Sequence, residues 1–457
     1  MTFGPNFLQL NLGSALTLRF AYKRPLLYFH MSRSLQEGIN YDKKEIGKSY
    51  TAVFLKIVPG SSAKGVGDNL KKLWLMLQDL KRGIVKESNV NERHLKSDNL
   101  SILIGYGPSL FDKAIVNNTK RLLPKDLEPS SLFLEPNAFG GGPIVKGSGL
   151  NYATDVHFNH VISDPITIQL IAETEFATKR AVVELWSLLR ELNTESKNSC
   201  PIRFSNWYTG FKRSDNRGWL GFHENLSNIL PRDRLSAISI NNNNIASGSE
   251  NWILNGTYLA FLRLVIDLPF WRNIKPEDQE RLVGRDKLTG CPFVGVNRSG
   301  QPLKDTRCPV RGTFEVVEKG NEMFREHPKY AQVNASGGVS NKSLEYSHIG
   351  RTNRADKLSP AMNESYRIFR QGFEFLEPQT SPPFLRLGLN FVSFQNRTRK
   401  LINILSSPSY LGGTNFGGDS SKPIQGIDRF ISVRSGGFFL VPPIVKTEIF
   451  PGSSLFQ

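Results

Sequence analysis

The sequence has little cysteine and no cysteine motif of a metal site. Only three cysteines occur among 457 residues, and these are Cys200, Cys291 and Cys308. They are too few and too widely spaced for a disulfide framework, and no Cys-x-x-Cys or His-Glu-x-x-His pattern indicates a zinc site. This usage favours a reducing compartment, so we expect the protein in the cytoplasm.

Long apolar runs and early acidic residues are also missing. No run reaches the roughly 18 apolar residues of a membrane-spanning helix, so we expect no membrane span. The first thirty residues contain Arg19, Lys23 and Arg24 but no Asp or Glu. A targeting leader has this composition, and so does an upstream extension before a start at Met31. We interpret residues 1–33 as an N-terminal extension.

Basic residues outnumber acidic ones. The chain has 58 Lys and Arg against 41 Asp and Glu, a formal net charge of +17. Such a charge suits nucleic acid, acidic lipid or a small anionic substrate. The excess is diffuse, without a long basic tract or a known nucleic-acid motif, so we expect no specific nucleic-acid partner. With 39% hydrophobic residues, the composition is typical of a globular protein with a large core.

Apolar periodicity predicts strands alternating with helices, arranged as two α+β halves joined near residues 205–215. The glycine-rich segment 140–149 lacks a following Lys-Ser/Thr pair, so we interpret it as a loop, not a phosphate cradle. Strands are predicted at residues 51–58, 100–105, 166–172, 257–267, 389–394 and 438–441, helices around residues 70–80, 182–192 and 276–283, and a long loop at 311–346.

Three short segments in the second half carry candidate catalytic residues. Glu224 follows a Gly-aromatic pair, so a tight loop could direct its carboxylate into a cavity. His348 is close in sequence to Arg351, and imidazole is a common axial ligand of haem iron while arginine suits haem propionates. Arg370 stands beside a phenylalanine and near a glycine, and could stabilise a developing anion. Taken singly, each is better explained by an exposed acid or a structural salt bridge.

Together the three segments resemble the dye-decolouring peroxidases, a family of haem b peroxidases. Residues 221–225 correspond to the family's Gly-x-x-Asp-Gly loop, residues 348–351 to its His-Ile-x-Arg segment, and residues 370–372 to its Arg-x-Gly turn. The resemblance covers about residues 34–457. Other stretches typical of the family lie at residues 35–39, 149–153, 256–263, 280–285, 388–395, 437–443 and 450–452.

The resemblance implies an α+β fold of two tandem ferredoxin-like halves, each an antiparallel sheet with packed helices. Residues 34–210 would form the N-terminal ferredoxin-like domain, and residues 211–457 the C-terminal one that binds haem. The implied function is a haem-dependent peroxidase that reduces hydrogen peroxide and oxidises dyes, phenolics or other bulky donors in one-electron steps. Its cofactor would be heme b (iron protoporphyrin IX), its partners hydrogen peroxide and an organic electron donor, and its assembly a homo-oligomer.

The resemblance also assigns roles to single residues. His348 would be the proximal iron ligand, and Glu224 and Arg370 the catalytic residues on the distal side. There the acid would move a proton between the peroxide oxygens, and the arginine would stabilise the developing negative charge. The cofactor would also contact Arg351, through a propionate, and the apolar residues Leu389 and Phe391.

The sequence departs from the family at the catalytic acid. Glu224 stands in place of Asp, and Asn225 in place of the glycine that follows. One extra methylene can move the carboxylate by more than about 1 Å, and such a misplacement can cost about 100-fold in rate. The alternative function is therefore a haem-binding protein of the same fold with little peroxidase turnover. A smaller departure is Gly350, where the family commonly has a basic residue.

Overall fold

The computed structural model describes only part of the chain. The predicted loop at 311–346 and the extension before Arg33 lie outside the described residues. The described residues are 33–40, 47–85, 96–128, 145–146, 149–150, 164–195, 200–215, 217–223, 228–229, 231–287, 290, 293–296, 302–304, 348, 368–405 and 430–457.

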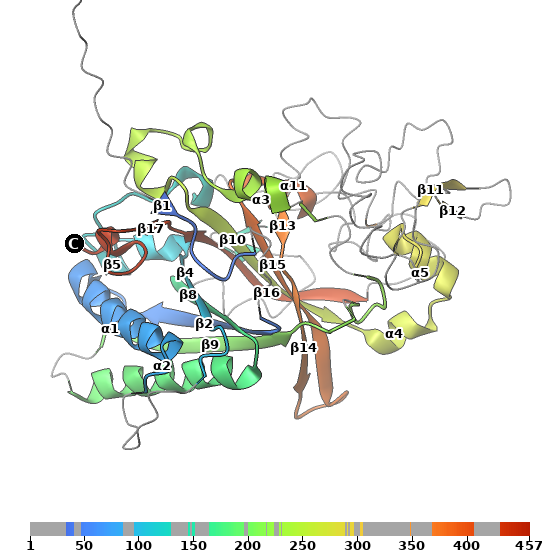
Figure 1. Cartoon of the computed structure of the whole chain (residues 1–457), viewed down its shortest axis with the longest axis horizontal. Coiled ribbons are helices and arrows are strands. Elements are labelled where there is room, and N and C mark those ends of the chain that lie inside the picture. The colour runs from blue at the N-terminus through green and yellow to red at the C-terminus, as the bar shows by residue number, and fades with distance from the viewer. Residues whose placement is uncertain are drawn as a thin grey trace, which may run out of the picture.

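The N-terminal part of the chain forms a four-stranded antiparallel unit. Its strands lie in the order β4-β8-β2-β9, and helices α1 and α2 pack side by side on one face of the sheet (Figure 1). Two strand-helix-strand crossovers with this order make a ferredoxin-like unit. The elements are β2 (Ser49–Ile57), α1 (Ala63–Lys81), β4 (Ser101–Tyr106), β8 (Ile166–Ala172), α2 (Glu175–Glu195) and β9 (Ile202–Phe211).

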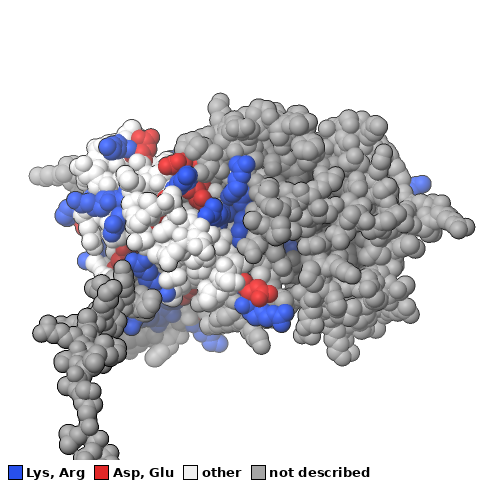
Figure 2. Space-filling view, turned by 90° about the horizontal axis from the view of Figure 1, so that it is seen from above, with Lys and Arg blue, Asp and Glu red and all other residues white. Residues whose placement is uncertain are grey.

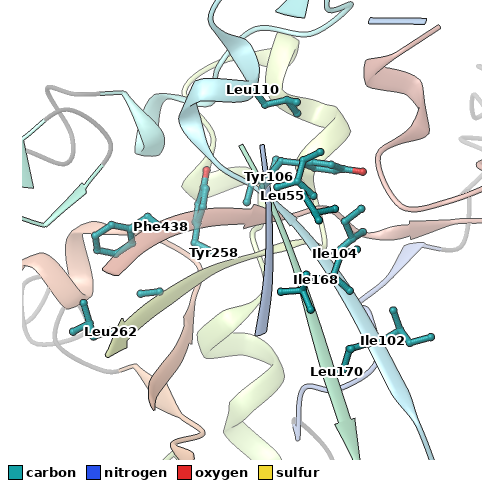
Figure 3. Packing of buried hydrophobic residues seen from close by; sticks show 14 of the residues in the cluster. Leu55, Ile102, Ile104, Tyr106, Leu110, Ile168, Leu170, Tyr258, Leu262 and Phe438 are labelled. Carbon is teal, nitrogen blue, oxygen red and sulfur yellow. The ribbon is translucent and has the colours of Figure 1, made fainter. Parts of the chain in front are cut away.

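Local sequence signals explain helix α1. The Ser62 side chain accepts a hydrogen bond from the Gly65 N–H at 3.1 Å and so caps the helix N-terminus. Leu70, Leu73 and Leu77 repeat at helical spacing and are buried against the sheet. Figure 3 shows the strand side of the same core, where Ile104 and Ile168 lie on neighbouring strands.

The C-terminal part repeats this strand order. Its strands lie in the order β14-β15-β10-β16, again antiparallel, and the two-residue strand β13 also pairs with β15. The elements are β10 (Thr257–Ile266), α4 (Leu268–Asn273), α5 (Pro276–Val283), β13 (Phe369–Arg370), β14 (Phe373–Pro378), β15 (Leu385–Gln395), α11 (Arg399–Leu405) and β16 (Ile431–Val441).

The two sheets face each other and join at both edges. Strand β16 pairs with β4 at one edge, and β14 pairs with β9 at the other. An aromatic core fills the space between them, in which the Tyr50 ring stacks on Phe373 at 4.4 Å and Phe54 lies 5.4 Å from Phe261. Each sheet therefore has one inner face in this shared core and one outer face.

Short elements complete the described structure. They comprise the pairs β1 (Arg33–Ser34) with β17 (Ile444–Val445), β3 (Ser61–Ser62) with β5 (Val116–Asn117), β6 (Val145–Lys146) with β7 (Gly149–Leu150), and β11 (Phe293–Val296) with β12 (Pro302–Lys304), the helix α3 (Pro231–Ile238), and 3-10 turns at Pro108–Phe111, Lys125–Leu127, Asn242–Asn244, Gly248–Ile253 and Ser453–Leu455.

The α+β class with ferredoxin-like units is confirmed, and most predicted elements are present. Strand β9 was missed, because residues 202–211 were interpreted partly as the joint between halves. The segment 140–149 was predicted to be a loop but includes β6 and the first residue of β7, and these two short strands pair with each other. The division at residue 210 stays a prediction. Within the described ranges, no helix is long and apolar enough to cross a bilayer.

Surface charge agrees with the diffuse pattern of the sequence. On the face shown in Figure 2, Lys and Arg occur in separate groups around an uncharged area, with Asp and Glu between them. A continuous basic stripe of the kind that follows a nucleic-acid backbone is not seen on the described part of this face.

Candidate active site

An apolar wall lies on the outer face of the C-terminal sheet. Leu389 and Phe391 are partly buried on β15, whereas Asn390 between them is fully buried. The Asn390 amide donates to the Thr209 carbonyl of β9 at 2.8 Å, so it points inward toward the N-terminal sheet. Because side chains alternate along a strand, Leu389 and Phe391 point to the outer face.

A buried arginine supports this wall from behind. Arg263 on β10 is 3% exposed, and its guanidinium donates to the Asn390 side chain at 2.5 Å and to Glu377. It also lies over the rings of Tyr208 at 4.3 Å and Phe375 at 3.5 Å. These contacts fix the position of β15, and therefore of the outward-facing Leu389 and Phe391.

Arg370 lies on the same outer face. It pairs with Ser393, which follows Phe391 by two residues, and residues paired across an antiparallel ladder share a face. The Asn228 side chain clamps the Arg370 backbone, donating to its carbonyl at 2.7 Å and accepting from its N–H at 3.1 Å. Gly372 completes the Arg-x-Gly turn, and a Cβ there would lie 3.0 Å from Leu389 Cδ1.

His348 lies close enough to Arg370 for the arginine charge to act on its imidazole. Burial, together with the positive charges of Arg370 and Arg285, lowers the pKa of the imidazole to about 3. His348 is therefore neutral at physiological pH, which leaves a ring nitrogen able to bind a metal. The structure thus places His348 within electrostatic reach of Arg370, and Arg370 on the same sheet face as Leu389 and Phe391.

Arg285 is a site residue that the sequence analysis included only within a family-like stretch. It follows Gly284, which ends α5 in the left-handed conformation at φ 85°. Its guanidinium is nearly buried and donates to the Gly290 carbonyl at 2.8 Å. Burial and the charge of Arg370 lower its pKa to about 9. A helix followed by Gly-Arg was the available signal, but sequence alone could not place it near His348.

Glu224 and Arg351 lie outside the described residues, but the loop before Glu224 is described up to His223. Arg217 holds this loop by donating to the carbonyls of Gly221 and Lys287, both at 2.9 Å. Gly221 has a φ of 83°, and a Cβ on it would lie 2.6 Å from Lys287 Cε. The loop is therefore packed against the segment that follows α5.

The described residues fit a haem group. A neutral, buried imidazole can serve as an axial ligand, and two guanidinium groups suit the carboxylates of propionates. The lowered pKa values of His348 and Arg285 have the same cause, since each is buried beside positive charge. An anionic ligand would relieve this repulsion. Among the described residues, no group of three or more His, Cys, Asp or Glu side chains could hold a metal ion without a cofactor.

Comparisons with known proteins show similarity in sequence and in fold. Residues 215–446, about half of the chain, match the family described as Dyp-type peroxidase, C-terminal. A dye-decolorizing peroxidase from Exidia glandulosa is 25% identical over 242 residues, which cover 44% of this chain and 47% of that protein. A deferrochelatase from Escherichia coli O6:K15:H31 is 22% identical over 383 residues, covering 81% and 72%.

Solved structures share the fold. Ferric DtpA from Streptomyces lividans has a TM-score of 0.61 at 18% identity, covering 92% of this chain and 95% of that one. A DyP-type peroxidase from Streptomyces coelicolor has a TM-score of 0.62 at 17% identity, covering 93% and 98%. The chain spans less than half the length of the Exidia relative and 38% of a deferrochelatase from Escherichia coli O157:H7.

Proposed function

The chain belongs to the DyP-type peroxidase family, and on this premise we propose that it is a haem-dependent peroxidase. Its substrates would be hydrogen peroxide and a bulky organic donor, such as a dye or a phenolic compound, oxidised in one-electron steps. The cofactor would be heme b. The proposed compartment is the cytoplasm, because cysteine is scarce.

The observation that carries this proposal is the setting of His348. A neutral imidazole lies within electrostatic reach of two buried or partly buried arginines, and one of them, Arg370, lies on the sheet face that also presents Leu389 and Phe391. The charges that lower these two pKa values are positive, and such a setting favours the binding of an anionic cofactor. A haem with iron and propionates gives each of these residue types a partner.

Haem, when bound, would supply the redox chemistry, and the protein would supply orientation and electrostatics. His348 would bind the iron through its unprotonated nitrogen, and Leu389 and Phe391 would exclude water from the opposite side. Arg370 would stabilise the negative charge that develops as the O–O bond of peroxide breaks. Arg351 is proposed as a propionate partner.

Glu224 is proposed as the residue that moves a proton from the inner to the outer oxygen of peroxide. The residues on both sides of it support this role. The preceding loop is tied to Lys287, two residues after Arg285, and Asn228 is bonded to the backbone of Arg370. Glu224 lies between these two contacts in the sequence.

The second candidate function is haem binding with little peroxidase turnover. The observation that favours it is the glutamate at position 224, where the family has aspartate. Several Escherichia coli relatives bear the name deferrochelatase and not peroxidase. In this case the residues that hold haem are retained, while the placement of the catalytic acid is lost.

The experiment that separates the two is stopped-flow absorption of the haem-loaded full-length protein after a small excess of hydrogen peroxide. A peroxidase changes its Soret band rapidly and recovers when a dye donor is added. Arg370→Ala should slow this change by about 100-fold to 1,000-fold, because one charge-stabilising donor is removed. Slow change in the parent that Glu224→Asp accelerates would support the haem-binding function instead, and Asp68→Glu on α1 is a matched acidic control, since this side chain is 59% exposed.

A further inference from the structure

Helix α2 has an apolar stripe on its exposed face. Phe176, Val183 and Trp186 are 67%, 55% and 44% exposed, and they recur at i, i+7 and i+10, which lie on one side of a helix. Leu185 and Leu189 on the opposite side are buried against the N-terminal sheet. A single exposed apolar residue is ordinary, but several aligned on one helix face mark an interaction surface.

Two arginines lie along the same stripe. The Arg180 guanidinium lies 5.8 Å from the centroid of the Phe176 ring, and that of Arg190 lies 4.7 Å from the Trp186 ring. Aromatic residues and arginine are the residue types most enriched at the energetic centres of protein interfaces. The stripe therefore has the composition of a protein-binding surface.

The stripe is symmetric about Val183. Phe176 and Arg190 are each seven residues from Val183, and Arg180 and Trp186 are each three residues from it. When two copies of a helix cross antiparallel at one residue, positions equally far before and after that residue lie opposite each other. Each aromatic residue would then face an arginine of the second copy: Phe176 would face Arg190, and Trp186 would face Arg180.

We propose that α2 forms a two-fold homodimer interface, with two copies of Val183 at the axis. A two-fold contact uses the same surface on both subunits, and the stripe is complementary to itself in this way. Cation–π contacts across the axis would add to apolar burial. In Figure 1, α2 lies on the opposite side of the molecule from α4 and α5, so this dimer leaves the candidate active site accessible. The inference does not depend on haem.

Sedimentation velocity of the full-length protein between 1 and 100 µM tests the interface. The parent is expected to dimerise, and Val183→Arg should weaken association by at least about 100-fold, because it places two like charges against each other at the axis. Leu235→Arg is the matched control, since Leu235 is also exposed on a helix, α3, at 49%. Thermal melting of both variants should match the parent, which would show that folding is retained.

Cysteine cross-linking tests the register. Val183→Cys places two thiols at the axis, within the roughly 7 Å Cα separation that a disulfide permits, so oxidation should give a covalent dimer. Thr194→Cys lies further along the same helix, and its two copies would be about 33 Å apart at 1.5 Å per residue, so it should not cross-link. The parent protein, oxidised in the same way, shows how much cross-linking its own three cysteines cause.

A parent that stays monomeric at 100 µM, or a Val183→Arg variant that dimerises as well as the parent, would overturn the proposal. So would cross-linking of Thr194→Cys as efficient as that of Val183→Cys. A monomer that binds phosphatidylserine vesicles through Phe176 and Trp186 would also overturn it, because the stripe would then be a lipid-binding surface.

Discussion

The N-terminal and C-terminal units share one strand order but use the outer faces of their sheets differently. In the N-terminal unit, α1 and α2 cover the outer face with helices of 19 and 21 residues. Strand residues under them, such as Ile168 and Leu170, are at most 2% exposed. In the C-terminal unit, α4 and α5 have only 6 and 8 residues, and Leu389 and Phe391 remain partly exposed.

This difference shows how one topology can form a fully covered core in one unit and carry the proposed binding site in the other. Leucine side chains from α1 and α2 complete the apolar core of the first unit. On the outer face of the second sheet lies Arg370, within electrostatic reach of His348 and Arg285. Function thus lies in the side chains placed on the fold, and the fold by itself does not determine it.

Replacing His348 is the most direct test of haem binding by the C-terminal unit. His348→Ala should weaken haem binding by more than the roughly 100-fold that loss of an outer-shell contact costs, because the iron ligand itself is removed. Haem titration followed by Soret absorption measures this, and added imidazole should restore part of the spectrum. His94→Ala, in the connection between α1 and β4, is the matched control. A titration curve unchanged from that of the parent would refute the ligand assignment.

Local signals predicted much of the fold. Strand β8 and helix α5 begin and end where they were predicted, because apolar residues alternate along most of β8, and Pro276 and Gly284 mark the two ends of α5. Strand β9 could not be predicted in this way, since of its ten residues only Ile202 and Gly210 are buried. Its place in the sheet depends on pairing with β2, and a contact between distant segments leaves no local pattern.

The candidate site, too, could be predicted only in part, because it depends on contacts between distant segments. The motif resemblance predicted His348 and Arg370, yet nothing in either segment indicates that Arg285 lies near both. That proximity depends on β13 pairing with β15 and on the chain turning at Gly284 after α5. Glu224 and Arg351 remain predictions.

Replacing one leucine by alanine on each outer face tests how tightly the two faces are packed. Leu170→Ala should destabilise the protein by about 3 kcal/mol, because it leaves a cavity in a fully packed core. Leu389→Ala should cost less than half as much in the haem-free protein, because Leu389 is only partly buried. Midpoints of urea unfolding measure both changes, and haem loading should increase the Leu389 effect alone. Equal losses in the haem-free protein would mean that both outer faces are packed alike.

The smallest expected effect concerns the contact between the units at Asp126. This residue precedes β8 in the chain, and its carboxylate accepts from the Thr398 N–H at 3.1 Å, just before α11 of the C-terminal unit. Its pKa is raised from 3.8 to about 6, mainly by burial and also by Glu250, while Arg397, the Thr398 hydrogen bond and Lys125 oppose the shift.

A raised pKa means that the folded protein holds this proton more tightly than the unfolded chain does. The stabilisation is complete below pH 3.8 and is lost as the pH rises through about 6. Asp126→Asn cannot titrate, so it should be more stable than the parent at pH 8 by about 1 kcal/mol, with no such gain near pH 4. Thermal melting across this range measures the difference, and Asp112→Asn is the exposed control. If the difference in melting temperature between Asp126→Asn and the parent were the same at every pH, the two units would not be coupled through this carboxylate.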